Sequence, residues 1–397
     1  MDALTTPSNW QKVRLGDIAE IIGGGTPSTQ ITSFWNGSIN WFTPTEIGIT
    51  KYVYKSQRTI TLLGLKKSSA KLLPIGTILL TSRASIGDCA ILKVVATTNQ
   101  GFQSLIPLEK INNEFLYYLM LTLKNKLLKL ASGSTFLEVS PNKIKNLLIP
   151  LPPLNEQIAI ANILSGLDRY LCVLDALILK KEGVKKALSF ELLSQRKRLK
   201  GFNQNWQRVR LGTYKYRRGS FPQPYGNPQW YSDNGMPFVQ VYDVGENFKL
   251  TQKTKQKISK IAQPMSVFVP KNSVIITLQG TIGRVALTQY DCYCDRTILI
   301  FDNNTLNDVN KYFFVLSLFT KFEEEKRKAD GSIIKTITKQ TLKDFEILLP
   351  PLNEQIAIAN ILSGLDSEII SLKNKKRQFE NIKKALNHDL MSAKIRV

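Results

Sequence analysis

Three short motifs contain residue types that catalyse reactions on nucleotides or nucleic acids, but each departs from the pattern that its chemistry needs. Gly23-Gly24-Gly25-Thr26-Pro27 is glycine-rich like a phosphate cradle, yet Pro27 has no N–H to donate and no helical pattern follows directly. Glu324-Glu325-Lys326 has a nuclease-like Glu-x-Lys spacing inside the charged run EEEKRK, which favours a solvated helix face. Asn227-Pro228-Gln229-Trp230 differs at its third residue from the base-holding Asn-Pro-Pro-aromatic motif, so we interpret it as a turn.

Histidine and cysteine usage gives no further catalytic or metal-binding pattern. His388 is the only histidine, which argues against histidine acid–base catalysis and histidine metal ligation. The four cysteines, Cys89, Cys172, Cys292 and Cys294, show no Cys-x-x-Cys spacing. We therefore expect reduced thiols, no metal site, and a cytoplasmic protein without catalytic residues of its own.

The charge balance indicates a polyanionic partner. Lys and Arg number 54 against 31 Asp and Glu, a formal net charge of +23, in a globular composition with 43% hydrophobic residues. Nucleic acid and an anionic membrane face both suit such a surplus. The apolar run near membrane length is broken by Asp175 and Lys180-Lys181, and Met1–Pro7 lacks the pattern of a secretory signal, so we expect no membrane partner.

The chain contains an internal sequence duplication. Leu151–Asp168 recurs without change as Leu349–Asp366, and the stretch NWQKVRLG at Asn9–Gly16 returns as NWQRVRLG at Asn205–Gly212. A weaker repeat relates Pro74–Gly87 to Pro270–Gly283. This is domain duplication, because solenoid repeats have periods of only tens of residues.

The repeat divides the chain into two globular and two helical parts. Short β-branched runs with Gly and Pro punctuation, and helical apolar spacing elsewhere, predict mixed α/β structure for residues 1–150 (domain 1) and 200–348 (domain 2). Residues 151–199 and 349–397 are predicted helices, each entered through Pro-Pro, with Asn155 and Asn353 as N-caps.

An alternating three–four spacing of apolar residues runs along both predicted helices, from Ile160 through Ile163 and Val184 to Leu188, and from Leu362 through Ile382 to Leu390. Such a stripe must be buried, and the other copy is the simplest partner. We predict an α+β fold with a pseudo-two-fold internal repeat, in which an antiparallel coiled coil joins the two domains. The alternative is two separate helices, each packed on its own domain.

Basic and amide residues lie among aromatic residues in the predicted loops and strand ends of both domains, where they suit phosphate contacts and base-edge recognition. The candidate DNA-binding residues are Thr26, Ser28, Gln30, Arg83, Ser85 and Asn99 in domain 1, and Arg217, Arg218, Gln223, Tyr225, Lys253, Lys255, Gln279 and Arg284 in domain 2.

The whole pattern resembles the specificity (S) subunit of type I restriction–modification enzymes. The resemblance rests on Asn9–Ser28, Phe34–Trp41, Gly64–Ile91, Thr98–Phe102, Arg217–Gly226, Gly235–Val244, Val267–Leu287, Asp295–Phe301 and the two PPLNEQ helix entries. It implies two target-recognition domains, each reading one half of a split site in double-stranded DNA, with the helices as spacers. The two domains match different versions of the recognition domain, so the implied site is asymmetric.

The resemblance also implies partners and cofactors. Two methyltransferase (M) subunits would dock on the frame, and up to two ATP-driven restriction (R) subunits would join them. No cofactor is then expected in this chain; S-adenosylmethionine, ATP and Mg²⁺ would belong to the partner subunits. Identical partners need equivalent docking patches, so the repeated helix starts are the candidate partner-docking residues: Asn155, Glu156, Gln157, Asn353, Glu354 and Gln355.

Other classes of protein remain open on the sequence. A related methyltransferase-only or fused restriction system would use a similar subunit. A self-contained methyltransferase or nuclease is disfavoured by the missing cofactor loop and the single histidine. A stand-alone DNA-binding regulator would need no partners and would leave the repetition of the helix starts without a role.

Overall fold

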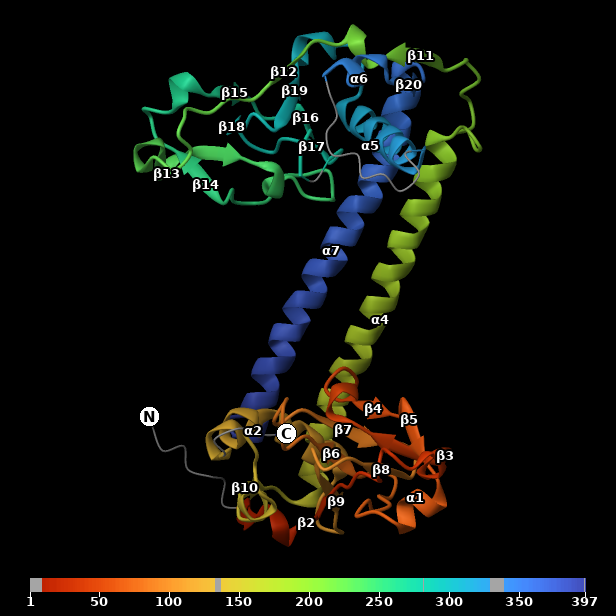
Figure 1. Cartoon of the computed structure of the whole chain (residues 1–397), viewed down its shortest axis with the longest axis vertical. Coiled ribbons are helices and arrows are strands. Elements are labelled where there is room, and N and C mark those ends of the chain that lie inside the picture. The colour runs from red at the N-terminus through yellow and green to blue at the C-terminus, as the bar shows by residue number, and fades with distance from the viewer. Residues whose placement is uncertain (1–8, 133–136, 281, 329–338, 396) are drawn as a thin grey trace. The chain divides into compact units, whose positions relative to one another are not determined.

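The computed structural model describes residues 9–132, 137–280, 282–328, 339–395 and 397, so the Met1–Pro7 segment lies outside the described residues. The chain forms two compact units. Unit 1 comprises Met1–Ala176 and Lys373–Val397, and unit 2 comprises Leu177–Leu372. Each unit therefore contains one domain together with part of each long helix, and Figure 1 labels the elements of both.

Unit 1 is built on two sheets. A five-stranded sheet has the order β2 (Ala19–Gly23), β9 (Gln103–Pro107), β6 (Ile78–Leu80), β7 (Cys89–Leu92) and β4 (Tyr52–Val53). A three-stranded sheet has the order β5 (Arg58–Ile60), β3 (Trp35–Phe42) and β8 (Ala96–Thr98). Strands β3 and β8 run parallel, while β3 pairs with β5 in antiparallel fashion.

Helices and a small two-stranded sheet complete unit 1. The helices are α1 (Leu62–Lys66), α2 (Asn113–Leu130) and α3 (Pro141–Lys145). Strand β1 (Gln11–Arg14) pairs with β10 (Leu148–Leu151), which joins the start of domain 1 to its end. Strands β6, β7 and β9 supply much of the core, because apolar side chains such as Ile78 and Leu105 pack with the buried face of α2.

Unit 2 largely repeats this topology. Its first sheet has the order β12 (Tyr216–Arg218), β19 (Ile298–Phe301), β16 (Val274–Thr277) and β17 (Val285–Leu287). Its second has the order β14 (Gln256–Ile258), β13 (Tyr231–Val239), β18 (Cys292–Cys294) and β15 (Val267–Val269), again with one parallel pair, β13 and β18. The helices α5 (Lys311–Lys328) and α6 (Lys339–Asp344) and the pair β11 (Gln207–Arg210) and β20 (Glu346–Leu349) correspond to α2, α3, β1 and β10.

Short 3-10 helices connect several strands in both units. They are η1 (Leu15–Asp17), η2 (Thr32–Phe34), η3 (Pro44–Glu46), η4 (Leu211–Thr213), η5 (Pro228–Trp230), η6 (Val241–Asp243), η7 (Gln263–Met265) and η8 (Asn303–Thr305). Asn227 caps η5 through its side chain, which accepts a hydrogen bond from the Gln229 N–H at 3.1 Å. The Asn-Pro-Gln-Trp motif is therefore the turn that the sequence predicts.

The two long helices are α4 (Leu154–Leu193) and α7 (Leu352–Met391), each 40 residues and so about 60 Å long. Both begin directly after Pro-Pro, so the N-cap prediction for Asn155 and Asn353 is wrong: the Pro153 carbonyl accepts the N–H groups of Glu156 and Gln157, both at 3.0 Å. Among the described residues, every helix is too short or too polar to span a bilayer.

Within each unit the two helices run antiparallel and are joined by matching ion pairs. In unit 1, Lys383 of α7 pairs with Asp168 of α4, and Lys376 pairs with Asp175 at 2.6 Å. In unit 2 the roles are exchanged, because Lys185 of α4 pairs with Asp366 of α7. Asp168 and Asp366 occupy the same position of the repeat, as do Lys383 and Lys185. The predicted antiparallel coiled coil and pseudo-two-fold repeat are confirmed.

The apolar stripe predicted along these helices is partly wrong. Ile163, Val184 and Ile382 are 40%, 46% and 43% exposed. The cause is that the helices also pack on the domains: Ile160 and Leu164 enter the core of unit 1 beside Leu390 at the end of α7. Each domain core thus buries the start of one helix and the end of the other, which rotates the buried face away from a strict heptad.

Candidate nucleic-acid interface

The connection between β2 and β3 in unit 1 is held by close backbone packing rather than shaped to cradle phosphate. The Gly25 N–H donates to the Thr98 carbonyl at 2.8 Å. A Cβ added at Gly24 would lie 1.9 Å from the Asn99 carbonyl oxygen, and one at Gly25 would lie 2.3 Å from Ser69 Oγ. These glycines are therefore required by close approach of two chain segments.

Two tryptophans of β3 fix the same connection from its other side. Trp41 Nε1 donates to the Gly25 carbonyl at 2.9 Å, and Trp35 Nε1 donates to the Ser28 carbonyl at 3.0 Å. The two indoles pack edge to face, with centroids 5.0 Å apart. The candidates Ser28 and Gln30 are exposed on this connection, while Thr26 donates through its hydroxyl to the side chain of Gln100.

A tight turn recurs between equivalent strands of the two units, after β6 and after β16. The Thr81 N–H bonds the Asp88 carbonyl at 2.9 Å, and the Thr277 N–H bonds the Arg284 carbonyl at 3.0 Å. Positive φ angles recur at Ala84 (55°) and Gly280 (67°). Arg83 and Gln279, one residue earlier in each turn, thus occupy equivalent places with different donor chemistry.

The structure brings several domain 1 candidates into neighbouring segments. The Ser82 N–H donates to the Gly101 carbonyl at 2.8 Å, and Asn99 Oδ1 accepts from the Gly101 N–H at 2.9 Å. The turn that carries Arg83 and Ser85 therefore adjoins the segment of Asn99. Arg83 is not wholly free, because its guanidinium pairs with Glu138 at 2.8 Å.

In unit 2, Arg217 and Arg218 end strand β12 and are exposed. Arg217 Nη2 donates to the Phe268 carbonyl at 3.1 Å. Gly219 then repeats the close approach of Gly24, since its Cβ would lie 2.3 Å from the Asp295 carbonyl oxygen. Gln223 follows and is exposed.

The Tyr225 hydroxyl is less available for contacts with DNA than the sequence suggests. Its hydroxyl donates to the carboxylate of the buried Asp295, and burial together with this bond raises its pKa above the ordinary value. Sequence reasoning missed Asp295 and Arg296, whose guanidinium carbon lies 5.4 Å from the Tyr225 ring centroid. They begin the Asp295–Phe301 stretch that carries the family resemblance, but only their position in the fold places them beside Tyr225.

Lys253 and Lys255 lie before β14, beside a polar hollow of about 320 Å³. Lys253 is exposed, and the Lys255 ammonium lies 5.1 Å from the Tyr242 ring centroid. The hollow is lined by Tyr231, Ser232, Asp233, Thr254, Lys255, Gln256 and Lys257. Its ammonium and amide donors suit DNA phosphate or base edges.

Arg284 is the candidate whose side chain is most engaged within the domain. Its guanidinium donates to the Val244 carbonyl at 3.2 Å and pairs with Glu246 at 2.8 Å. If Arg284 also reads a base, Arg284→Ala should relax one position of the DNA site, whereas Glu246→Ala should leave that position unchanged. Site selection from a randomised DNA duplex library measures both, and an unchanged site in Arg284→Ala would remove Arg284 from the readers.

The repeated helix starts bind their own domains. Gln157 Oε1 accepts from the Asn112 N–H at 2.9 Å, and its amide donates to the Pro152 carbonyl at 2.9 Å. Gln355 repeats both bonds with the Asn310 N–H at 3.0 Å and the Pro350 carbonyl at 2.8 Å. Gln157 and Gln355 are buried, so their repetition is explained inside the chain without reference to a partner.

The adjacent glutamates also bind inward, through different partners. Glu156 accepts from Trp10 Nε1 at 3.0 Å and from Asn9 Nδ2 at 3.3 Å. Glu354 accepts from Trp206 Nε1 at 3.2 Å and pairs with Arg198 at 2.8 Å. Of the six predicted docking residues, Asn155 and Asn353 alone are exposed.

An exposed apolar face does recur on the outside of both helix starts, and sequence reasoning missed it. Leu154 and Leu352 are 45% and 41% exposed, and Ile158 and Ile356 are 42% and 41% exposed. With the exposed Asn155, Asn162, Asn353 and Asn360 they form what we call the repeated helix face. The signal lay in the helical period, which places Leu154, Asn155, Ile158 and Asn162 on one face, opposite the buried Ile160.

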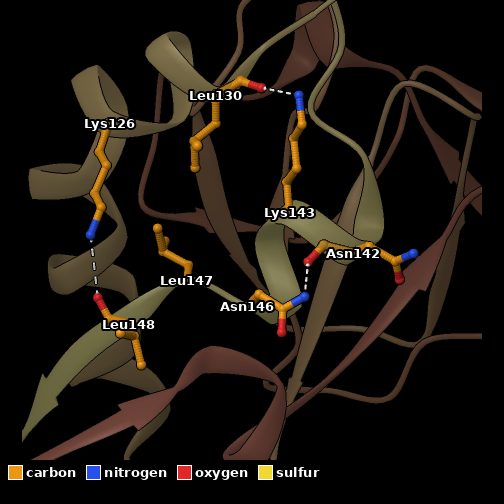
Figure 2. Close-up of a pocket in the computed structure, with 7 residues that line it drawn as sticks. All are labelled: Lys126, Leu130, Asn142, Lys143, Asn146, Leu147 and Leu148. Atoms are coloured by element: carbon orange, nitrogen blue, oxygen red, sulfur yellow. Dashed lines mark hydrogen bonds between the residues drawn. The ribbon is translucent and has the colours of Figure 1, made fainter.

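A hollow of about 460 Å³ lies between α2, α3 and β10 of unit 1, as Figure 2 shows. Lys126 Nζ donates to the Leu148 carbonyl at 3.4 Å, and Lys143 Nζ donates to the Leu130 carbonyl at 2.8 Å. Both ammonium groups thus face carbonyl oxygens of the walls. The described residues contain no cluster of His, Cys, Asp and Glu suited to a metal. Burial raises the pKa of the Cys89 thiol to about 12, so this cysteine stays protonated at neutral pH.

Comparisons with known proteins agree with this architecture. The family model described as "Type I restriction modification DNA specificity domain" matches residues 7–182 and 223–381. The MjaIX specificity subunit of a type I restriction enzyme from Methanocaldococcus jannaschii is 28% identical, over 98% of this chain and 94% of its own length.

Two solved structures share the fold over nearly the whole chain. The S subunit of the type I restriction–modification system from M. genitalium is 18% identical with a TM-score of 0.62, and the match covers 98% of each chain. A chain from a study of complex assembly and conformational transition of the type I R-M system is 20% identical, with a TM-score of 0.64 and 98% coverage of each chain. The chain belongs to the family of type I restriction–modification DNA specificity subunits.

Proposed function

We propose that this chain reads an asymmetric, bipartite sequence in double-stranded DNA, with one half-site assigned to each domain. The observation that carries the proposal is one topology built twice with different side chains at equivalent loop positions, such as Arg83 and Gln279. A net charge of +23 supports binding to the DNA backbone. Two domains of the same topology with different loop side chains suit two half-sites of different sequence.

The chain contributes recognition in this proposal, and its partners contribute catalysis. Two of the candidate chemical motifs have structural roles: Gly24-Gly25 allows close packing of the backbone, and Asn227 caps a turn. Methyl transfer would then come from M subunits that bind S-adenosylmethionine, and ATP and Mg²⁺ would serve R subunits. The purified chain with labelled S-adenosylmethionine and DNA tests this: we expect no methyl transfer, and transfer by the chain alone would contradict it.

The repeated helix face is the proposed docking surface for two M subunits. Leu154 and Ile158 on α4 match Leu352 and Ile356 on α7 in both identity and exposure, as two copies of one partner require. Gln157 and Gln355 would then support docking by holding each helix start in place.

Charges on this face should abolish assembly without unfolding the chain. We expect Ile158→Lys together with Ile356→Lys to prevent co-purification of methyltransferase subunits, because each variant places an ammonium in an apolar contact. Val173→Lys is the matched control, since Val173 is an exposed apolar residue of α4 outside the repeated sequence. Equal recovery of partners with the double variant and the wild type would contradict this docking surface.

A further inference from the structure

Arg58 of strand β5 forms a preorganised donor group that no motif predicts. β5 is an edge strand of the three-stranded sheet, and Arg58 is the register partner of Trp41 on β3. Its guanidinium carbon lies 3.8 Å from the Trp35 ring centroid and 5.4 Å from that of Trp41. The side chain is exposed, and within the described part of the chain it makes no ion pair.

The close approach of the Arg58 guanidinium to the Trp35 ring restrains the side chain without using its N–H groups. An arginine on an aromatic face keeps its planar fork of donors at the ring edge, where a planar acceptor pair can meet two of them. Arg83 and Arg284, by comparison, already use their guanidinium groups on Glu138 and Glu246. The guanidinium N–H groups of Arg58 thus have no hydrogen-bond acceptor among the described residues.

The same two indoles order the candidate loop beside Arg58. Trp35 and Trp41 hold the carbonyls of Ser28 and Gly25, so the guanidinium and the β2–β3 connection share one support. β5 and β3 form the edge of a three-stranded sheet, and the DNA major groove, which admits two β-strands side by side, is where guanine presents the O6 and N7 acceptors. Arginine bidentate to these two atoms is the commonest sequence-specific contact.

We propose that Arg58 reads a guanine through O6 and N7 in the half-site bound by domain 1. This inference rests on the proposed function of the chain as a DNA reader. Domain 2 supports a specificity role for the position, because Gln256 on β14 pairs in register with Phe238 on β13 as Arg58 pairs with Trp41. Glutamine is the usual bidentate partner of adenine, so the two domains present different base preferences at one site of the fold.

The experiment uses the full chain with the subunits that co-purify with it, and a duplex library carrying a randomised segment. Wild type, Arg58→Ala, Arg58→Lys and Arg58→Gln select DNA in parallel, with Arg14→Ala as the control for loss of one exposed cation. Arg14 lies on β1, which pairs with β10 and not with the sheet of Arg58. Lysine keeps a cation that can donate to guanine but lacks the planar fork, so Arg58→Lys tests how much of the guanine preference depends on the fork geometry.

We expect Arg58→Ala to reduce the preference for guanine at one position by about 5- to 150-fold, and Arg58→Lys to reduce it by less, because lysine can also donate to O6 and N7. The other half-site and the Arg14→Ala site should be unchanged, and Arg58→Gln should favour adenine at that position. An unchanged site, or uniform weakening with a smaller salt dependence, would overturn base reading by Arg58, the latter pattern marking a phosphate contact. Failure of the wild type to select any bipartite site would instead overturn the proposed function.

Discussion

Exchange of residues 1–150 for the first recognition domain of another family member should change one half of the DNA site and leave the other half intact. Domain 1 is enclosed between β1 and β10, and its candidate DNA-binding residues all lie inside that span. The helix starts that follow both domains are identical in sequence, so the joint is preserved. The expected effect is a complete change of the bases methylated in one half-site.

The structure defines the conditions for this exchange. The core of unit 1 includes Ile160 and Leu164 of α4 and Leu390 and Met391 of α7, so the donor domain must accept these four side chains. Exchange of residues 200–348 is the matched experiment and should alter the other half-site alone. Sequencing of all methylated positions in the host measures both outcomes, and a simultaneous change in both halves would contradict independent reading.

Arg198→Ala should lower the free energy of unfolding by about 3 kcal/mol, because it leaves the buried Glu354 carboxylate without its cation. The Glu354 side chain is 1% exposed, and among the described residues Trp206 alone would remain as its side-chain donor. Asn9→Ala is the control from the other repeat. Asn9 is an exposed donor to Glu156, and its loss should cost no more than about 1 kcal/mol.

Denaturant unfolding followed by tryptophan fluorescence gives both values. Glu354→Gln added to Arg198→Ala should recover part of the lost stability, because the neutral amide removes the uncompensated charge while its oxygen can still accept from Trp206. Equal losses for Arg198→Ala and Asn9→Ala would show that the Glu354 pair does not stabilise the helix start.

The sequence was sufficient for the repeat and the long helices because those signals are local or self-identical. The Pro-Pro entries and the three–four spacing led to elements that the structure confirms as α4 and α7. The N-caps at Asn155 and Asn353 were wrong because the preceding proline carbonyls already accept the first helical N–H groups. The sequence did not predict that Ile163 is exposed, because the domain core buries Ile160 and Leu164 of the same helix instead.

The candidate interface was predictable in composition but less so in arrangement. Polar residues in loops identified Ser28 and Gln30, which are exposed. The sequence could not show that Arg284 is held by Glu246, since those residues meet only through tertiary packing. Arg58 was missed for the same reason: its Trp35 and Trp41 neighbours are set by strand register and by the fold of β3.

The repeated NEQ sequence has a structural role that its recurrence alone did not show. Its exact recurrence suggested partner docking, whereas Gln157 and Gln355 close hydrogen bonds inside their own units. The exposed fractions of the side chains move the docking proposal to Leu154 and Ile158 and their copies Leu352 and Ile356.

The most direct test of the central claim is methylome sequencing of the native host with and without this chain. The chain is proposed to select the site at which its partners methylate, so its deletion should remove methylation at one asymmetric bipartite motif. Restoring the wild-type chain should return the same motif. Persistence of every methylated motif after deletion would contradict the account.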